Sequence, residues 1–488
     1  MNLKILNKSL HDIKGSFSPE SLLGSFLFFL VLSSWYVLRP VRNEMAVANV
    51  DDLPYLLAAG AIAMLVINPI YSAIVSKTNL RNIVFYCYSF LILNLIAFLS
   101  IWKFSDVGDS LWIGRVFYVW CNVYSFFVVS IFWVVIINIF RNSKTRSFYG
   151  VIMAGGSLGA IFGSQISKRF SNSFDEFGLE FFTLSAAILL FLAMILAMNI
   201  TKSSIAKKVV DGKSIGGGSL DSIKNSLKES EIRNIASYVW IWTCLMTIQW
   251  ITAINIIDDW SSDSQQRISF FATLEQIVSP LTLIIQLFFT NFLIKKIGIK
   301  NIMPAYGIIF LVAYLIYGLA PSITAVAFVT VLCRVFEYGL NKPSREMIYS
   351  VFNKNNRYKS SVLIDTFVTR FGDLTGSALI KLAGVTSIAT NALPLMALPI
   401  AGYLSYLGIK KLFAVIGGSM GGMQVLEWAT NTSSVLGDYK VIHEDEHSLC
   451  GFHSVVSPEK PEKRTKMVYM LLRGGKMALH HCREIVPD

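Results

Sequence analysis

The sequence has 488 residues, of which 54% are hydrophobic and only 15% are charged, and its mean hydropathy is +0.55. These values exclude an ordinary soluble protein of this length and indicate a multi-pass integral membrane protein. A net charge of +12 would suit nucleic acid only on a soluble basic face, and the sequence offers no such domain, so we expect no nucleic-acid partner.

Apolar runs long enough to cross a bilayer recur along the chain. They lie at about 22–41, 55–75, 83–102, 111–140, 148–167, 181–200, 234–257, 270–294, 302–320, 322–340, 361–383 and 390–409. The first run has no small-residue cleavage site, so we interpret it as a span and not as a secretory signal. The sequence therefore predicts an all-α membrane protein with twelve transmembrane helices.

Lys and Arg gather in alternate connections between these runs, whereas the opposite connections hold acids such as Asp51, Asp52, Asp258 and Asp259. Positive charge is retained on the cytoplasmic side of a membrane. We therefore predict that the N and C termini are both cytoplasmic, in a bacterial-type inner or plasma membrane.

The longest cytoplasmic connection divides the spans into six plus six, as in a two-bundle transporter whose site lies near the midplane between the halves. The predicted parts are an N-terminal cytoplasmic segment 1–20, a first six-helix bundle 21–200, a cytoplasmic linker 201–233, a second six-helix bundle 234–411 and a soluble, poorly ordered tail 412–488.

Two related charged motifs end the first and tenth runs, R-P-V-R-N-E-M (39–45) and K-P-S-R-E-M (342–347). Guanidinium groups suit phosphate or carboxylate because they donate two parallel hydrogen bonds. The motifs therefore indicate anion binding. The alternative is that the arginines reach the membrane interface, or pair with Glu44 and Glu346 to lock a gate.

The eleventh run carries Asp365, Arg370 and Asp373 within an arc of roughly 140°, at about 100° per residue of helix. Charges at membrane depth are costly unless they pair or face water, so this stripe should face away from lipid. Arg370 either engages a substrate or forms an internal salt bridge.

Two other predicted spans also carry charged residues that would need a partner or water. Arg334 and Glu337, three residues apart in the tenth run, share one helix face. Glu275 in the eighth run is a candidate proton or cation site.

Together these patterns give two sets of candidate residues. We expect substrate contacts from Arg39, Arg42, Lys342, Arg345 and Arg370. We expect gating or coupling roles for Glu44, Glu275, Arg334, Glu337, Glu346, Asp365 and Asp373. We expect no catalytic residue, metal, cofactor or disulfide framework, since the six Cys residues are scattered.

The stretch N-K-P-S-R-E-M-I-Y-S-V-F-N-K-N-N-R-Y-K-S-S-V-L-I-D-T-F-V-T-R-F-G-D-L-T-G-S (341–377) resembles the ATP:ADP antiporter family, the nucleotide translocases of intracellular bacteria and plastids. Y-V-L-R-P-V-R-N-E-M (36–45) and R-S-F-Y-G-V-I-M-A-G-G-S-L-G-A-I-F-G-S (146–164) resemble segments of the free-living bacterial relatives of that family. The resemblance covers about 20–411 and departs from the classical translocases around the first span. It implies a major-facilitator-like fold and exchange of ADP and phosphate for ATP.

The expected function is therefore a secondary transporter that exchanges nucleotides or related phosphorylated anions by alternating access. Its partners would be a small anionic substrate and membrane lipid. The alternative is a proton-coupled carrier of another small solute, which would use Glu275 or Asp365.

The predicted tail, 412–488, does not share the resemblance that covers the spans. Residues 414–429 (A-V-I-G-G-S-M-G-G-M-Q-V-L-E-W-A) resemble the nucleophile elbow of homoserine O-acetyltransferases, with Ser419 at the nucleophile position. The tail is too short to hold the sheet that such an elbow needs, so we expect a fusion remnant and not an enzyme. A membrane-anchored acyltransferase acting through Ser419 is the alternative of another class.

The rest of the tail is polar. The pattern H-x3-H-x2-C-x2-H that begins at His443 has spacing compatible with zinc, but no second conventional pair follows it. We expect a short helix at 466–482.

Overall fold

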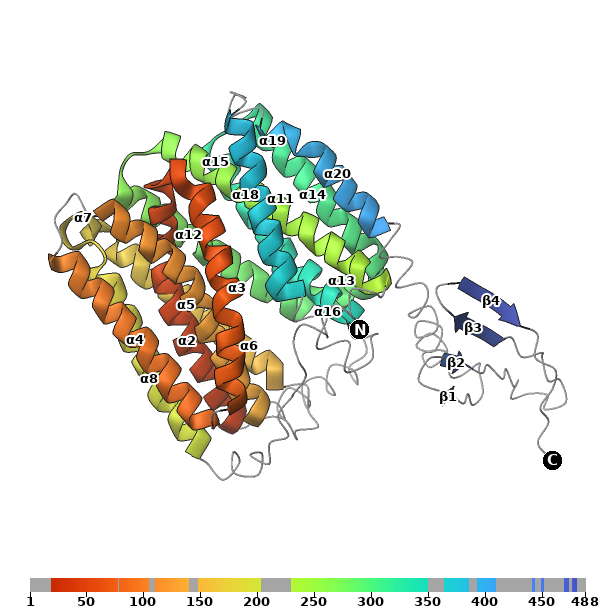
Figure 1. Ribbon diagram of the computed structural model, residues 1–488, viewed down its shortest axis with the longest axis horizontal. Helices are drawn as coiled ribbons and strands as arrows, with labels where there is room; N and C mark the ends of the chain where they lie inside the picture. Colours follow the sequence, from red (N-terminus) through yellow and green to blue (C-terminus); the bar gives the residue numbers. More distant parts are fainter. Residues whose placement is uncertain are drawn as a thin grey trace, which may run out of the picture.

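Long helices make up most of the computed structural model (Figure 1). A helix satisfies its own backbone hydrogen bonds, which an apolar run in lipid requires. The structure describes residues 19–77, 79–104, 110–139, 148–202, 230–349, 364–385, 393–409, 441–443, 449–451, 469–473 and 476–480. Within these residues, eight helices are long and apolar enough to cross a membrane. The twelve crossings and the cytoplasmic termini stay predictions.

The first group of helices begins at Pro19. It comprises α2 (Pro19–Val47), η1 (Val50–Asp52), α3 (Leu53–Lys77), α4 (Leu80–Phe104), α5 (Ser110–Ile139), α6 (Phe148–Phe170), η3 (Ser171–Ser173), α7 (Phe174–Phe177) and α8 (Glu180–Lys202). Pro40 lies inside α2, in the first charged motif.

The second group contains three π-helical segments, η4, η5 and η6. It comprises α11 (Ser230–Trp260), α12 (Ser264–Ile284), η4 (Ile285–Phe289), α13 (Thr290–Ile297), α14 (Ile299–Leu319), α15 (Ile323–Phe336), η5 (Glu337–Asn341), α16 (Lys342–Tyr349), η6 (Ile364–Val368), α18 (Thr369–Val385), α19 (Leu393–Met396) and α20 (Leu398–Leu407).

Helices α2 and α6 lie unusually close together because glycines face the α2 backbone. A Cβ atom on Gly155 would collide with the carbonyl oxygen of Ser25, and one on Gly159 with that of Phe29. Small residues permit such close approach in membranes. Serine hydroxyls then bridge the two helices, and Ser25 Oγ donates to Val151 O at 2.9 Å.

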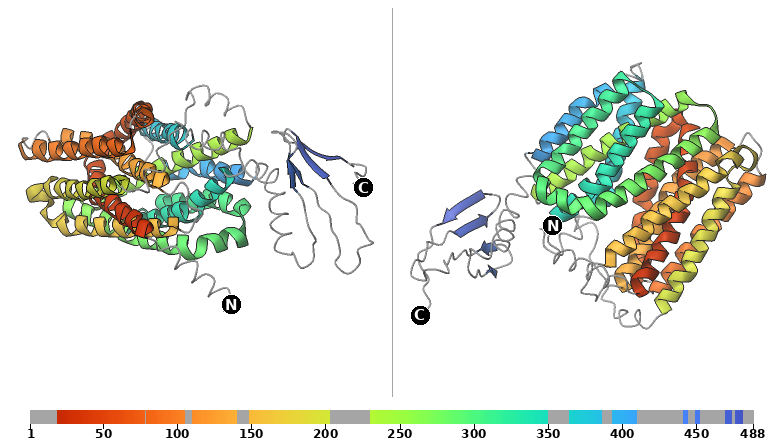
Figure 2. Two further views of the ribbon diagram at one scale, coloured as in Figure 1. Left: turned by 90° about the horizontal axis from the view of Figure 1, so that it is seen from below. Right: turned by 180° about the vertical axis from the view of Figure 1, so that it is seen from behind.

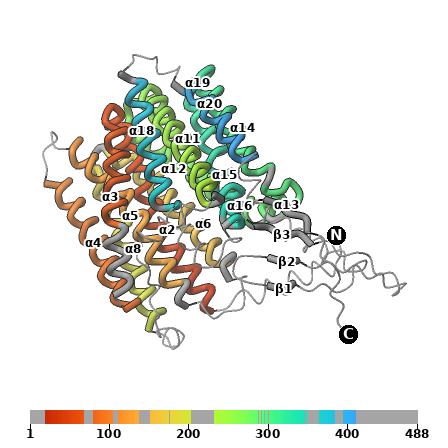
Figure 3. Tube along the Cα trace, turned by 45° about the vertical axis from the view of Figure 1, so that its right-hand side comes forward, coloured from red at the N-terminus to blue at the C-terminus, as the bar shows by residue number. Residues whose placement is uncertain are grey.

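The two groups lie side by side and touch through particular helix pairs (Figures 1 and 2). Helix α12 packs against α6 and α2, and α18 packs against α3. Figure 3 shows α3 and α18 as neighbours from a second direction. Charged residues of α2, α12 and α18 therefore lie near this boundary. The exact bundle limits that we predicted are not tested by these contacts.

The tail is described only in four short strands. β1 (Val441–His443) pairs antiparallel with β2 (Leu449–Gly451), and β3 (Tyr469–Arg473) pairs antiparallel with β4 (Lys476–His480). The helix predicted at 466–482 is wrong, because the apolar residues of this segment form a hairpin. Ser419, together with His447 and His453 of the zinc-compatible pattern, lies outside the described residues.

Candidate functional site: an arginine-rich interface between two helix groups

Two guanidinium groups share one buried carboxylate where α2, α12 and α15 meet. Arg39 Nε lies 3.3 Å from Glu275 Oε1, and Arg39 Nη1 also donates to the Tyr36 hydroxyl at 3.2 Å. Arg334 donates to both oxygens of Glu275, at 2.5 and 2.8 Å. The Glu275 side chain is only 2% exposed. Two positive charges and one negative charge leave this trio with one excess positive charge.

One helical turn further along α2, Arg42 is held by neutral groups. Its Nη2 donates to Asn122 Oδ1 at 2.7 Å and to the Tyr118 hydroxyl at 3.2 Å, both on α5. Its Nη1 donates to Asn43 Oδ1 at 3.2 Å. The guanidinium carbon lies 4.5 Å from the centre of the Tyr118 ring, a cation–π contact. Among the described residues, no carboxylate lies within ion-pair distance of Arg42.

Asp373 of α18 lies on the other side of the boundary. Its Oδ2 accepts from Arg370 Nη1 at 2.8 Å, and its Oδ1 accepts from the Thr247 hydroxyl of α11 at 3.0 Å. Asp373 also lies within electrostatic range of Arg42. The two groups of helices thus bring a guanidinium and a carboxylate toward each other here.

A fourth polar cluster is built around the π-helical segment η5. Glu337 accepts from Asn341 Nδ2 at 2.5 Å and from Arg345 Nη2 at 3.3 Å. Tyr238 of α11 donates to Asn341 Oδ1 at 3.1 Å. Arg345 lies over the Trp242 ring, 4.4 Å from its centre. This carboxylate is therefore already paired within the second group.

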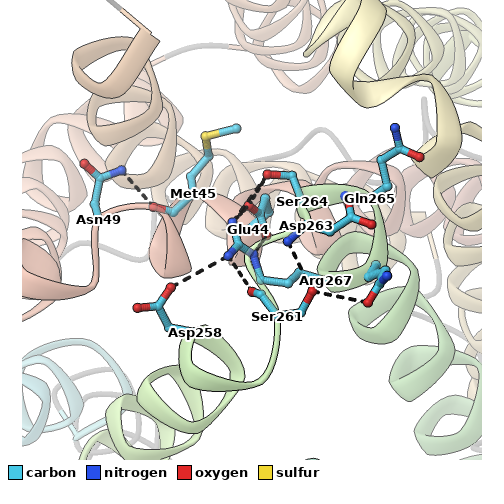
Figure 4. Close-up of polar contacts among 10 residues, drawn as sticks. Glu44, Met45, Asn49, Asp258, Ser261, Asp263, Ser264, Gln265 and Arg267 are labelled. Carbon is cyan, nitrogen blue, oxygen red and sulfur yellow. Dashed lines mark hydrogen bonds and ion pairs between the residues drawn. The ribbon is translucent and has the colours of Figure 1, made fainter.

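Glu44, near the end of α2, is bound by the first turn of α12 (Figure 4). Arg267 donates through Nε and Nη2 to the two oxygens of Glu44, at 2.8 and 2.5 Å. Ser264 Oγ donates to Glu44 Oε1 at 2.8 Å. Arg267 also donates to Ser261 O and lies 3.7 Å from Asp258. This ion pair, which we term the Glu44–Arg267 latch, is buried and joins the two groups at one end.

The structure distributes the predicted residues unevenly. Arg39, Glu275 and Arg334 meet in one trio, whereas Arg334 and Glu337, which share a face in sequence, have different partners. Arg370 pairs with Asp373 on its own helix and not between the two groups.

Three predicted residues lie away from these clusters or cannot be placed. Asp365 and Lys342 are exposed. Asp365 belongs to η6, whose wider π turn breaks the 3.6-residue phase assumed for one stripe with Arg370. The Glu346 side chain lies outside the described residues.

Sequence reasoning missed the groups that hold the predicted arginines, among them Tyr118, Asn122 and Thr247. It also missed Arg267, although this residue offered a signal. It is the one basic residue after the acids Asp258, Asp259 and Asp263 in a connection that otherwise lacks positive charge. No group of three or more His, Cys, Asp or Glu side chains suited to a metal occurs in the described part of the chain.

No protein-family model matches the chain. Among solved structures, the chain is similar to the nucleoside transporter NupG, with a TM-score of 0.58 and 13% identity over 82% of this chain and 99% of NupG. It is also similar to a bacterial homologue of the iron transporter ferroportin, with a TM-score of 0.51 and 14% identity over 82% and 98% of the two chains. The chain therefore shares the helical fold of these two structures. It is an integral multi-pass membrane protein.

Curated relatives match only a small piece. Homoserine O-acetyltransferase of Methanococcus vannielii is 54% identical over 39 residues, which are 8% of this chain and 8% of that enzyme. The Zymomonas mobilis enzyme is 78% identical over 27 residues, 6% of this chain and 7% of the enzyme. The chain thus spans less than a tenth of these relatives. These short matches agree with the resemblance noted at 414–429, which lies outside the described residues.

Proposed function

We propose that the protein is a secondary transporter that exchanges nucleotides or related phosphorylated anions, as the resemblance to ATP:ADP antiporters implies. The observation that carries this proposal is the excess of positive charge at the boundary of the two helix groups. The Arg39–Glu275–Arg334 trio contributes one uncompensated charge, and Arg42 contributes a second.

Buried cations are costly unless an anion or water compensates them. In the latch the charges of Glu44 and Arg267 cancel. Asp373 and Glu337 are each paired with one arginine, so these pairs carry no excess charge. Arg39 and Arg42, three residues apart, lie on neighbouring turns of α2. A bound anion would therefore compensate both excess charges, which is why Arg39 and Arg42 are the contacts that the geometry favours most.

The remaining predicted contacts have weaker support. Arg345 and Arg370 already bind carboxylates, so they would reach substrate only by exchanging partners. Lys342 is exposed at the start of α16. Glu44, Glu275, Arg334, Glu337 and Asp373 would act by holding or releasing these cations as the two groups rock about the site.

Uptake into proteoliposomes tests the proposal. The purified protein would be loaded with internal ADP and offered labelled ATP, ADP, inorganic phosphate and other phosphorylated anions. We expect counter-transport that Arg39→Gln and Arg42→Gln each reduce at least about tenfold, because each removes a charge-assisted contact.

Arg115→Gln is the matched control. Arg115 pairs with the partly exposed Asp52 at 2.5 Å, so its loss should leave uptake nearly unchanged. Equal uptake by all three variants would contradict the residue assignment. Absence of exchange with every anion would contradict the substrate class.

A second candidate is a proton-coupled carrier of another solute. It is favoured by Glu275, a buried carboxylate of α12, and by Asp373, whose hydroxyl partner Thr247 comes from another helix. Such a carrier would respond to an imposed pH gradient and would not be stimulated by internal substrate. An exchanger would show the reverse pattern.

A further inference from the structure

Tyr338 is the one residue of the π-helical segment η5 that is not buried. It is 37% exposed, whereas the other four residues, Glu337, Gly339, Leu340 and Asn341, are buried inside the second group. Within the described residues, the hydroxyl group of Tyr338 has no hydrogen-bond partner. The Tyr338 side chain therefore points away from the ion-paired face of η5 and keeps a free donor.

This direction leads to the Arg39–Glu275–Arg334 trio. Tyr338 follows Arg334 by four residues, so the two side chains lie one helical turn apart on one face. Tyr338 is within electrostatic range of the Arg334 guanidinium and of the Tyr36 hydroxyl. Tyr36 belongs to α2 and Arg334 to α15, so the phenol of Tyr338 lies at the boundary of the two helix groups.

The backbone of η5 is held from the facing helix. Gln286 Nε2 donates to the carbonyl oxygen of Tyr338 at 3.0 Å, and Thr290 Oγ1 donates to that of Gly339 at 2.6 Å. Segments of π-helix are rare and often occur at functional sites. Since Gln286 binds the peptide group of Tyr338 itself, it fixes the position from which this side chain reaches the boundary.

Two tyrosine hydroxyl groups thus flank the excess positive charge of the trio, one from each helix group. The Tyr36 oxygen accepts from Arg39 Nη1 at 3.2 Å, which leaves its O–H as a donor. The O–H of Tyr338 is a second donor. The two arginines already share Glu275, so an anion that binds here gains most if it also has an oxygen for a hydroxyl group.

We propose that Tyr338 is a specificity-determining residue of the carrier, that its hydroxyl group donates to a tetrahedral oxyanion bound at the trio, and that Gln286 positions it. This inference rests on the proposed function and names the group that distinguishes a phosphoryl end from a carboxylate end. A phosphoryl group has three terminal oxygens in a pyramid, whereas a carboxylate has two in one plane. Two phosphoryl oxygens can face the arginines while the third accepts from Tyr338.

Binding to the purified full-length protein in detergent tests this assignment. The probes are inorganic phosphate and the pair methylphosphonate and acetate, which carry the same methyl group on the two kinds of anionic end. Tyr338→Phe removes the hydroxyl group and keeps the ring. We expect it to weaken methylphosphonate binding at least about tenfold and acetate binding less than about twofold.

Three further variants locate the effect. Tyr403→Phe is the matched control, because Tyr403 is 46% exposed on α20, which packs against α14 and α11 of the second group. It should leave both affinities unchanged. Gln286→Leu should weaken methylphosphonate binding, but not in a protein that already carries Tyr338→Phe, because Gln286 acts through Tyr338. Arg39→Gln should weaken both probes, since it removes a charge and not the hydroxyl group.

The outcomes separate this inference from the proposed function. If phosphate and methylphosphonate bind to Tyr338→Phe as tightly as to the unmodified protein, the inference is overturned, and exchange in proteoliposomes still supports the carrier. An equal loss of acetate and methylphosphonate binding also overturns it. If the losses from Gln286→Leu and Tyr338→Phe add, the positioning role of Gln286 is overturned.

Two results bear on the carrier itself. If Tyr338→Phe weakens methylphosphonate binding alone but no phosphorylated anion is exchanged across the membrane, the inference stands and the exchanger is overturned. If no phosphorylated anion binds to the unmodified protein, both are overturned.

Discussion

The acidic residues of the interface differ mainly in how many arginines they pair with and in which helices those arginines belong to. Glu275 neutralises parts of two arginines from two helices, whereas Glu337 and Asp373 each hold one arginine from nearby in sequence. Removing the carboxylate of Glu275 would leave two guanidinium groups facing each other without a counter-ion. Glu275 therefore pairs with more guanidinium groups than Glu337 or Asp373 does.

We predict that Glu275→Gln lowers the free energy of unfolding in detergent by about 3–5 kcal/mol, the usual cost of leaving a buried charge unpaired. Asp52→Asn is the matched acid-to-amide control, because the Asp52 side chain is 40% exposed and its pair with Arg115 should be worth about 0–1 kcal/mol. Denaturant titration followed by tryptophan fluorescence measures both. Equal losses in the two variants would show that the Glu275 trio is not stabilising.

The sequence showed which charged residues fall within apolar runs, but not which groups they pair with. Arg334 could be identified because it interrupts an apolar run. Its pairing with Glu275 depends on which helices become neighbours, and helix order in space is not encoded in local spacing. Arg267 was missed for a related reason: it lies just outside a predicted span and gains its role only from contact with Glu44.

The longer helices follow from local sequence, since every described helix of eight or more residues in the two groups overlaps or adjoins an apolar run. The π-helical segments do not follow from it. In η5 the wider turn is supported from outside, because Gln286 Nε2 donates to Tyr338 O at 3.0 Å and Thr290 Oγ1 donates to Gly339 O at 2.6 Å. Such segments often occur at functional sites. Here η5 begins at Glu337 and ends at Asn341, and Asn341 donates a hydrogen bond to Glu337.

The close packing of α2 on α6 gives a prediction about single glycines. Gly159→Ala should destabilise the protein by about 1–3 kcal/mol, because a methyl group there meets the backbone of Phe29 and the helices must separate. Gly402→Ala, with open space around its Cβ position, should gain about 0.5–1 kcal/mol from helix propensity. Thermal unfolding in detergent measures the signs, and a stable Gly159→Ala variant would contradict the packing.

At the scale of the two helix groups, the Glu44–Arg267 latch is the ion pair that joins them at one end. Alternating access requires that contacts at one end break while others form. The latch is a buried, bidentate ion pair between α2 and α12, so it has to open whenever that end of the protein opens.

Joining the two latch positions covalently should therefore stop transport. In a Glu44→Cys/Arg267→Cys variant, a short thiol-reactive cross-linker that contains a disulfide should reduce exchange to the level of empty liposomes. A reductant should then restore the activity that the variant had before treatment. Each single-cysteine variant receives the same reagent as a control for the native cysteines. Continued exchange by the cross-linked protein would rule out opening at this end.

The serine and glycine contacts along α2 have a mechanical consequence. Ser25 Oγ, Ser33 Oγ and Ser167 Oγ each bond to a carbonyl of the opposite helix, so α2 and α6 are joined at intervals over most of their length. We expect such a helix pair to move as one unit. Arg39, Arg42 and Glu44 all belong to α2, with Arg42 directed to α5 and Glu44 to α12, so we expect a displacement of the latch end to carry the backbone of both arginines with it.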